Sequence, residues 1–390
     1  MFLRNTPLQP HTIYTCPVIP SLESVNWRSF LARPRLPSPE VEVFDALDRQ
    51  PILITGAGGS IGSALALRLA VLTPPALLLL ESSESHLYAL NRAWAEAGTA
   101  CYMTPILGNA ADVALIEHIF AAHRPRIVFH AAAFKHVPLM EEQPLAAIAN
   151  NIFATETLAM AAAANGARLI LLSTDKAVEP ASVMGATKRV AEQIVLASGG
   201  IVVRLGNVLA SRDSVVELFA RQIAQGGPVT VTDPAARRYF LTLDEAVNLL
   251  LIAAALTMPS TLLAPLLPAP HYVSDLAHFM IRELAPSREI PIDFTAPRPG
   301  DKITEQLWSS TDQTRPILPG ASSQTPVLVS IQTTHLSPAQ LASGLENLRA
   351  ALDTRNLAAA LVHLTLLVPD YTPSPSVLAL SLQQGSRVSL

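Results

Sequence analysis

The chain has 390 residues, enough for two or three domains, and its composition excludes several classes of protein. Its net charge is −4 and its pI is about 6.2, so it offers no basic face for nucleic acid. Cys16 and Cys101 form neither a disulfide framework nor a metal-ligand spacing, and they suit a reducing, cytoplasmic compartment. Only 15% of the residues are charged, below the roughly 25% usual for soluble domains, so we expect a homo-oligomer.

The apolar stretches predict neither a signal peptide nor an integral membrane segment. Residues 1–20 contain several prolines and no continuous apolar core. The longest uncharged run, 246–270, is interrupted by prolines and is typical of a buried helix followed by an extended loop. His123 and His130 show no metal-ligand spacing with acidic or cysteine clusters, so no metal site is expected.

Short apolar runs alternate with helical patterns from residue 51 onward. They lack polar alternation, as strands buried on both faces do, and lie at 51–55, 76–81, 126–132, 168–174 and 200–205. This rhythm predicts an α/β fold, a doubly wound parallel sheet covered by helices on both sides, with a smaller lobe. We expect four parts: an N-terminal extension (1–50), a Rossmann domain (51–205), a range that is mainly the smaller lobe (206–318) and a helical tail (319–390). Within the third range, a helix near 242–256 is expected to return to the Rossmann domain.

The first strand runs into the sequence TGAGGSIGS, which predicts a dinucleotide site. Gly56, Gly59 and Gly62 allow a tight turn, close approach to a pyrophosphate and close packing of helix on strand, with the helix beginning near Ser60 and Ile61. Glu81 ends the second strand, where a carboxylate binds the adenosine ribose and repels a 2′-phosphate, so NAD is favoured over NADP. Alternatively, Glu81 is only an acid before the next helix.

The stretch 173–189, STDKAVEPASVMGATKR, raises a chemical question. Met184 and Lys188 lie four residues apart on one helix face, where short-chain dehydrogenases carry a tyrosine and a lysine. Methionine cannot carry a proton, so the site has lost that base. Asp175 and Lys176 precede the helix, at the carboxyl end of a strand, where open α/β sheets bind ligands. The alternative is that they form a surface ion pair, with Lys188 solvated.

The chain resembles the polysaccharide-biosynthesis proteins that act as UDP-N-acetylglucosamine 4,6-dehydratases, which are extended short-chain dehydrogenases/reductases. It is most similar to their long form, which also has methionine in place of tyrosine. That form usually begins with membrane helices and a further domain; neither is expected here, and residues 30–36 are interpreted as a remnant of the junction. The resemblance covers about residues 50–372 and rests on the segments ITGAGGSIGS, HAAAFKHVPLMEEQP, LSTDKAVEPASVMGATKR, RLGNVLASR, GGPVTVTDP, RYFLTLDEA, RPGDK and LVPDY.

The resemblance implies a reaction and roles for the residues. NAD takes a hydride from C4 of the sugar, a base removes the C5 proton, water leaves from C6, and the hydride returns to C6. Lys176 matches the C5 base and Asp175 the acid, as a coupled pair that shares a proton. A neutral Lys176 requires a pKa lowered toward seven, which desolvation and Lys188 would provide. Thr174, Asp175 or a water accepts the C4 proton, and Met184 packs.

The same resemblance implies binding residues. Ala131, Asn109 and Lys188 are expected at the cofactor. A UDP-sugar substrate is expected to meet a set of polar and basic residues, although His136 is equally a packed neutral histidine; the set is Lys135, His136, Asn207, Arg204, Arg212, Arg238 and Arg298.

Several positions depart from the family pattern and keep rival functions open. Asn109 stands where the family has an aspartate, and Ala210 and Asp213 stand where it has glycines, so that a carboxylate lies near the expected diphosphate. The residues 261–276 replace a strand expected in the smaller lobe. One rival is a UDP-sugar 4-epimerase, for which Asp175 and Lys176 have no purpose. The other is a catalytically inactive dinucleotide-binding pseudoenzyme.

Overall fold

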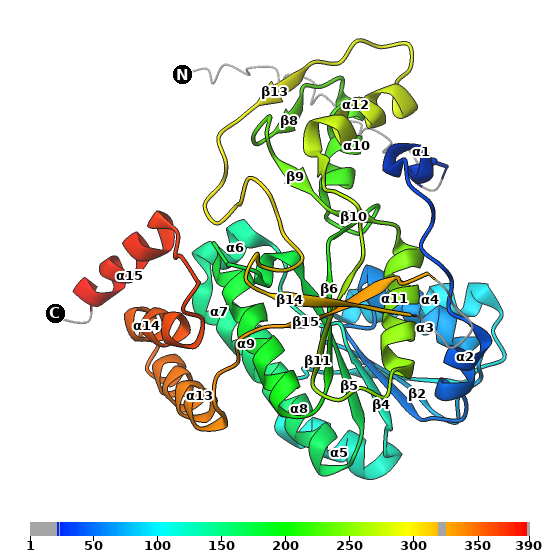
Figure 1. Ribbon diagram of the computed structural model, residues 1–390, viewed down its shortest axis with the longest axis vertical. Coiled ribbons are helices and arrows are strands. Elements are labelled where there is room, and N and C mark those ends of the chain that lie inside the picture. Colours follow the sequence, from blue (N-terminus) through cyan, green and yellow to red (C-terminus); the bar gives the residue numbers. More distant parts are fainter. Residues whose placement is uncertain (1–21, 23, 319–324, 388–390) are drawn as a thin grey trace, which may run out of the picture.

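Nine strands form the central sheet of the computed structural model, which describes residues 22, 24–318 and 325–387 (Figure 1). Their order is β14-β15-β11-β6-β5-β4-β1-β2-β3. The seven strands from β11 to β3 run parallel, and β15 and β14 continue the sheet antiparallel. The bounds are β1 (Ile52–Thr55), β2 (Leu77–Glu81), β3 (Met103–Leu107), β4 (Ile127–His130), β5 (Arg168–Thr174), β6 (Ile201–Leu205), β11 (Thr261–Pro265), β14 (Gln313–Ile317) and β15 (Leu328–Gln332).

Helices cover both faces of this sheet, which confirms the predicted doubly wound α/β fold. On one face α5 (Val113–His123), α8 (Ala154–Ala164) and α9 (Val183–Ala197) pack together, and on the other α3 (Ser60–Ala70) packs against α11 (Leu243–Ala255) (Figure 1). The strand order reverses between β1 and β4. Open sheets of this kind bind ligands at the carboxyl ends of the strands beside such a reversal.

Four strands of this sheet were not expected from the sequence: β3, β11, β14 and β15, of which β14 lies in the range expected to be mainly the smaller lobe. β3 alternates between half-buried and exposed residues at the edge of the sheet, so it lacks the continuous apolar run that marks a strand buried on both faces. Thr261–Pro265 was interpreted as part of an extended loop, but its five residues are buried and pair with β6 as β11. β15 lies in the range expected to be a helical tail, so that range was wrong in part.

The helix near 242–256 lies against the large sheet. α11 packs on β5, β6 and α3, and its N-terminus has a capping box in which Thr242 and Glu245 exchange hydrogen bonds. All its residues from Glu245 to Ala254 are buried, because the helix is covered on its other side by α2 (Val41–Leu47).

A second core forms the smaller lobe, above the sheet in Figure 1. Phe219, Phe240 and Phe279 are buried there. Phe30 packs edge-on against Phe240 and tilted against Phe279, with ring centroids 5.5 and 5.4 Å apart. Residues of the expected N-terminal extension therefore contribute to this core. The lobe consists of α1 (Trp27–Leu31), β7 (Asn207–Val208), α10 (Val215–Gln225), β8 (Val229–Val231), β9 (Arg237–Arg238), β10 (Phe240–Leu241), β12 (His271–Tyr272), α12 (Val273–Leu284) and β13 (Ile292–Phe294).

The N-terminal extension also binds the large domain. Between α1 and α2, the Arg33 guanidinium forms a bidentate ion pair with Glu245, whose nearer N–O distance is 2.7 Å, and both side chains are buried. Residues 1–21 and 23, with Cys16 among them, lie outside the described residues.

The C-terminal helices pack beside the same face as α9. They are α13 (Pro338–Asp353), α14 (Leu357–Leu367) and α15 (Pro375–Arg387), and with them α6 (Val137–Glu142) and α7 (Pro144–Ile148) complete the layer (Figure 1). Residues 319–324 and 388–390 of the expected tail lie outside the described part of the chain.

One helical stretch, Pro144–Ala164, is long and apolar enough by composition to cross a membrane. Just over half of its most apolar window, 56%, is buried inside the protein, where it packs on α9. A core helix passes the same test, so this stretch is weak evidence for a membrane span.

Candidate active site

β1 leads into the glycine loop, whose backbone requires glycine at two positions. Gly56 has a left-handed φ of +66°, and a Cβ there would lie 2.7 Å from the backbone of Ala132. A Cβ on Gly62 would lie 2.2 Å from the Gly56 carbonyl oxygen. Gly59 is the N-cap of α3, which begins at Ser60 and Ile61. The loop therefore aims the N-terminus of a helix at the carboxyl edge of the sheet, where it can bind an anion such as a pyrophosphate.

Glu81 lies at the carboxyl end of β2 and is buried. Its Oε2 accepts a hydrogen bond from the Gly58 amide at 3.0 Å, and its Oε1 accepts one from the Ser83 amide at 2.9 Å. The carboxylate thus links the glycine loop to the segment before α4 (Glu84–Ala97). Because a carboxylate has about four acceptor positions, this role leaves room for ribose hydroxyls as well.

Asn109 and Ala131 follow the next two strand ends. Asn109 is exposed after β3, and its Oδ1 accepts a hydrogen bond from the Ala111 amide at 2.9 Å. Ala131 follows β4, and its amide donates to the Thr55 carbonyl at 3.1 Å. The predicted cofactor residues of β1 to β4 therefore meet at one edge of the sheet, and the carboxylate of Glu81 is a group that disfavours a 2′-phosphate.

Arg212 lies on the glycine loop. Its guanidinium donates to the Gly58 carbonyl at 2.8 Å, and its amide donates to Ser60 Oγ at 2.9 Å. Lys135 Nζ in turn donates to the Arg212 carbonyl at 2.5 Å. The structure thus brings two residues predicted for the substrate to the cofactor loop, whereas the neighbouring His136 is exposed and is the N-cap of α6 without a side-chain hydrogen bond.

The loop that carries Arg212 explains one departure from the family pattern. Ala210 and Asp213 have φ values of +56° and +55°, in the left-handed region that favours glycine. The two non-glycine residues therefore add backbone strain to this loop. Asp213 is exposed, and its amide donates to Glu217.

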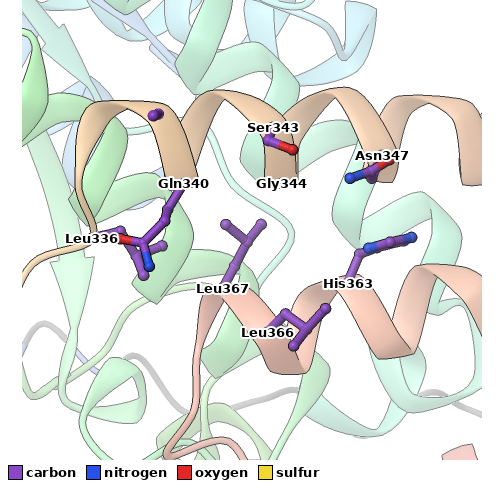
Figure 2. A pocket seen from close by; sticks show the side chains of 9 residues that line it. Leu336, Gln340, Ser343, Gly344, Asn347, His363, Leu366 and Leu367 are labelled. Carbon is purple, nitrogen blue, oxygen red and sulfur yellow. The ribbon is translucent and has the colours of Figure 1, made fainter.

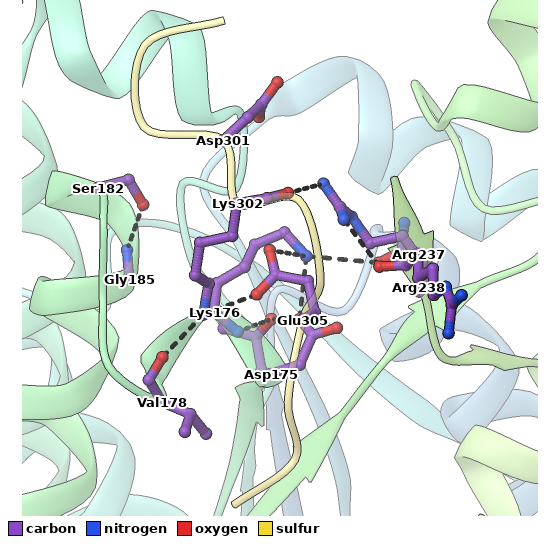
Figure 3. A network of polar contacts seen from close by, with 12 residues as sticks. Asp175, Lys176, Val178, Ser182, Gly185, Arg237, Arg238, Asp301, Lys302 and Glu305 are labelled. Carbon is purple, nitrogen blue, oxygen red and sulfur yellow. Dashed lines mark hydrogen bonds and ion pairs between the residues drawn. The ribbon is translucent and has the colours of Figure 1, made fainter. Parts of the chain in front are cut away.

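Thr174, Asp175 and Lys176 form a compact polar group at the carboxyl end of β5. Figure 3 shows Asp175 and Lys176 of this group. Asp175 is fully buried, and its Oδ1 accepts hydrogen bonds from Thr174 Oγ1 at 2.8 Å and from Lys176 Nζ at 2.9 Å. Among the described residues its Oδ2 has no hydrogen-bond partner. A buried carboxylate oxygen without a donor is costly, so Oδ2 marks a place for a ligand hydroxyl or a water.

The pKa of Lys176 differs from the expectation. Burial lowers its pKa, but the carboxylates of Asp175 and Glu305 outweigh burial, and the net pKa is raised. Lys176 Nζ lies 3.7 Å from Glu305 Oε1 and 3.3 Å from Asn207 Oδ1. The expected lowering of this pKa toward seven is therefore wrong for the structure without ligands, because Asp175 and Glu305 outweigh both burial and Arg238, and Lys188 is not among the groups that act on it.

Lys188 lies in the second turn of α9, on the side of the helix that faces the sheet. Its Nζ donates to the Leu172 carbonyl at 2.8 Å, and burial lowers its pKa to about 8. Behind it, His130 is buried and hydrogen-bonded to Thr55 and Thr155, and burial together with Lys188 lowers the His130 pKa to about 3. Met184 is buried in the large core cluster, so its side chain packs there.

The predicted arginines divide into three environments. Arg204 was expected at the diphosphate, but it is fully buried and forms a bidentate pair with Glu192 with two distances of 2.8 Å, so that expectation is wrong. Arg238 is buried and donates to the carbonyls of Lys302 and Ile303. Arg298 is exposed and pairs with Asp301 at 2.8 Å.

Sequence reasoning missed three residues around Asp175 and Lys176, namely Glu305, Lys302 and Tyr239. Glu305 is 2% exposed and lies between Lys176 and Lys302, with its Oε2 2.7 Å from Lys302 Nζ (Figure 3). Tyr239 is half-buried, and burial together with Asp175 raises its pKa, so its phenol stays protonated. The segments RPGDK and RYFLTLDEA contained two of these residues, but no pattern in them indicated that they reach β5.

The described residues contain no group of three or more histidine, cysteine or acidic side chains placed to hold a metal ion. A groove of about 460 Å³ lies elsewhere, between α13 and α14 (Figure 2). Its lining includes Gln340, Asn347, His363 and Leu366, which belong to α13 and α14 and to none of the loops that follow the parallel strands. The chemistry is therefore concentrated at the strand ends.

Comparison with known proteins agrees with this geometry. The model of the family described as polysaccharide biosynthesis protein matches residues 52–320. The capsular polysaccharide biosynthesis protein CapD of Staphylococcus aureus is 38% identical over 299 residues, which are 70% of this chain and 50% of that protein. The chain thus spans about half the length of that relative.

Two further proteins are similar to most of the chain. A UDP-glucose 4-epimerase of Rickettsia canadensis is 32% identical over 278 residues, 68% of this chain and 79% of that protein. The structure of Pen from Bacillus thuringiensis has a TM-score of 0.66 at 26% identity, covering 74% of this chain and 88% of that one. With the family model matching more than half of its residues, the chain belongs to the polysaccharide biosynthesis protein family.

Proposed function

We propose that the chain dehydrates a UDP-N-acetyl-hexosamine at C4, C5 and C6, as an NAD-dependent 4,6-dehydratase of the UDP-N-acetylglucosamine type. The observation that carries the proposal is the hydrogen-bonded group of Thr174, Asp175 and Lys176 at the end of β5, in which Asp175 is fully buried and its Oδ2 is unpaired among the described residues. An acid and a base side by side are what an elimination of water requires. The family membership supports the same reaction class.

The cofactor would be held by the glycine loop, Glu81 and Lys188. The fit rests on the close approach of Gly56 to Ala132, which leaves no room for a side chain, and on the N-terminus of α3 behind it. When bound, NAD supplies a hydride acceptor at C4 and returns the hydride at C6. Lys188, with a pKa of about 8 and a buried Nζ, has the ammonium that suits a ribose hydroxyl.

Proton balance assigns the roles of the catalytic residues. The C4 hydroxyl proton must leave when C4 is oxidised, and a proton must reach the departing C6 hydroxyl. Asp175 serves both steps if it accepts the first proton, directly or through Thr174, and donates it to the C6 oxygen as water leaves. Lys176 then removes the C5 proton in the elimination and returns it to C5 in the reduction.

The number of protons is conserved over one turnover only if Lys176 is neutral when Asp175 is ionised. Each turnover then begins and ends in that state, and one water leaves with the proton from C4. The raised pKa of Lys176 shows that the protein without ligands holds the ammonium instead. The rate should therefore rise with pH as Lys176 loses its proton, and binding of substrate and cofactor must lower its pKa.

The second candidate is a UDP-sugar 4-epimerase, and two observations favour it. The relative from Rickettsia canadensis has that name, and an epimerase needs no neutral lysine beside C5. Two observations speak against an epimerase. Met184 is buried and carries no proton, and the raised pKa of Tyr239 keeps its phenol protonated, so neither side chain can act as the base for the C4 hydroxyl.

The test is incubation of the purified protein with UDP-N-acetylglucosamine and NAD, followed by mass spectrometry and by NMR, which reports the configuration at C4. The proposal expects a product lighter by one water. A product of unchanged mass with inverted C4 would establish the epimerase. Bound NAD with no product from this or other UDP-sugars would contradict both candidates and favour a protein without catalytic activity.

A further inference from the structure

Lysine is rare in this chain, and each of its four occurrences contacts or belongs to a segment at the carboxyl edge of the sheet. The positions are 135, 176, 188 and 302, among 27 lysine and arginine residues in total. Lys135 holds the Arg212 loop, Lys188 contacts β5, and Lys302 Nζ donates to the Val178 carbonyl at 2.7 Å, two residues after Lys176. Arginine cannot give up its proton in a protein, whereas lysine can. A chain that otherwise uses arginine thus has lysine at the candidate active site.

Lys302 and Glu305 reach this place on a loop held by the smaller lobe. The Arg237 amide donates to the Ile303 carbonyl at 2.8 Å, and the Glu305 amide donates to the Arg237 carbonyl at 3.3 Å. Arg238 donates to the carbonyls of residues 302 and 303 from the same strand, β9. Four hydrogen bonds thus determine where Glu305 lies, and Figure 3 shows its carboxylate between the two lysines.

We propose that Glu305 and Lys302 are positioning residues that set the proton affinity of Lys176. The four side chains alternate in charge, with Asp175 and Glu305 on either side of Lys176 and Lys302 beyond Glu305. Glu305 favours the ammonium of Lys176, and Lys302 weakens that effect by sharing the Glu305 carboxylate. The inference rests on the proposed function for its purpose, since only a proton-transfer role requires this control.

The other groups that face Lys176 limit what else can control its proton. Asp175 is its neighbour in the chain, Asn207 on β7 offers an uncharged oxygen, and Arg238 on β9 opposes the ammonium. Tyr239 stays protonated, so it adds no charge near Asp175. Glu305 is therefore the anion through which the smaller lobe acts on Lys176, and moving its loop away would lower the pKa of Lys176.

The experiment is an NMR titration of the lysine side chains, with only four signals to resolve. The full chain is prepared with labelled lysine, and each signal is assigned by a single Lys→Arg variant. Glu305→Gln should lower the pKa of Lys176 by about 1 to 2 units, as loss of an anion within 4 Å does. Glu305→Gln combined with Lys302→Met should return the pKa part of the way, because one cation is lost as well.

Asp301→Asn is the matched control, since it removes an anion from the same loop that pairs with Arg298 instead. It should move the Lys176 signal by less than about 0.3 units. The inference is overturned if Glu305→Gln also shifts Lys176 by less than that while the Lys188 and Lys135 signals show a folded protein. The titration needs no turnover, so a shifted Lys176 pKa in a protein that fails to dehydrate any UDP-sugar would reject the proposed function alone.

Discussion

Replacing Arg204 by methionine tests whether this arginine stabilises the fold or binds substrate. Arg204 and Glu192 are 1% and 0% exposed, and their side chains share two hydrogen bonds of 2.8 Å. Burial raises the pKa of Glu192, but Arg204 outweighs burial and lowers it to about 2, so the carboxylate is charged. Arg204→Met would leave that charge with Ser173 and a longer contact to Arg189.

The expected loss follows from the environment of the pair. Breaking a buried ion pair by removing one partner destabilises a protein by about 3 to 5 kcal/mol. For a chain of 390 residues such a loss lowers the melting temperature by roughly 4 to 6 °C. A second variant, Arg204→Met with Glu192→Gln, also removes the buried carboxylate charge and should recover at least half of the loss.

The assay is thermal and urea unfolding of the wild type and both variants, with the KM for UDP-N-acetylglucosamine measured below the transition. A stable Arg204→Met protein, within about 1 kcal/mol of the wild type and with a KM raised tenfold, would refute the structural role. It would restore the original expectation that Arg204 contacts the substrate diphosphate.

Three other changes test separate parts of the structure. The His130 pKa is about 3 in the folded protein, so on acidification the unfolded chain binds the proton at a higher pH than the folded protein does. Between pH 7 and pH 4.5 the unfolding free energy of the wild type should therefore fall by about 2 to 3 kcal/mol more than that of His130→Asn, measured by urea midpoints. Lys188→Met should stabilise the cofactor-free protein at pH 7 by up to about 3 kcal/mol and weaken NAD binding. The gain in unfolding free energy should shrink toward pH 10, because burying the ammonium costs most below the Lys188 pKa of about 8. Ala210→Gly should raise the unfolding free energy by up to about 1 kcal/mol in calorimetry, since φ is +56° there, and a lower melting temperature would contradict this strain.

The parts of the fold that could be predicted have strong local signals. The strands around Ile54 and Leu79 are buried on both faces and read as continuous apolar runs, and the glycine loop follows directly. β3 lacked that signal because it is a half-exposed edge strand containing Pro105. β15 could not be expected because it pairs with β11 and β14 in the antiparallel direction, at an edge that the βαβ pattern does not describe.

The candidate site divides in the same way. Thr174, Asp175 and Lys176 are consecutive, so one segment places all three. The neighbours that set their charge come from elsewhere: Glu305 arrives on a loop held by β9, and its effect on Lys176 is opposite to the lowered pKa expected from burial. For Arg204 the residue type suited a phosphate, but its partner Glu192 lies on α9, and only the packing of α9 on β6 reveals the pair.

The most direct test of the account is deuterium incorporation at C5 during turnover in D₂O. The wild-type protein, incubated with UDP-N-acetylglucosamine and NAD, should give a 4-keto-6-deoxy product that carries deuterium at C5. Lys176→Gln should keep NAD bound and oxidise C4 in a single turnover, yet neither exchange C5 nor release water. Normal C5 exchange in Lys176→Gln would contradict the central claim that Lys176 is the base of the elimination.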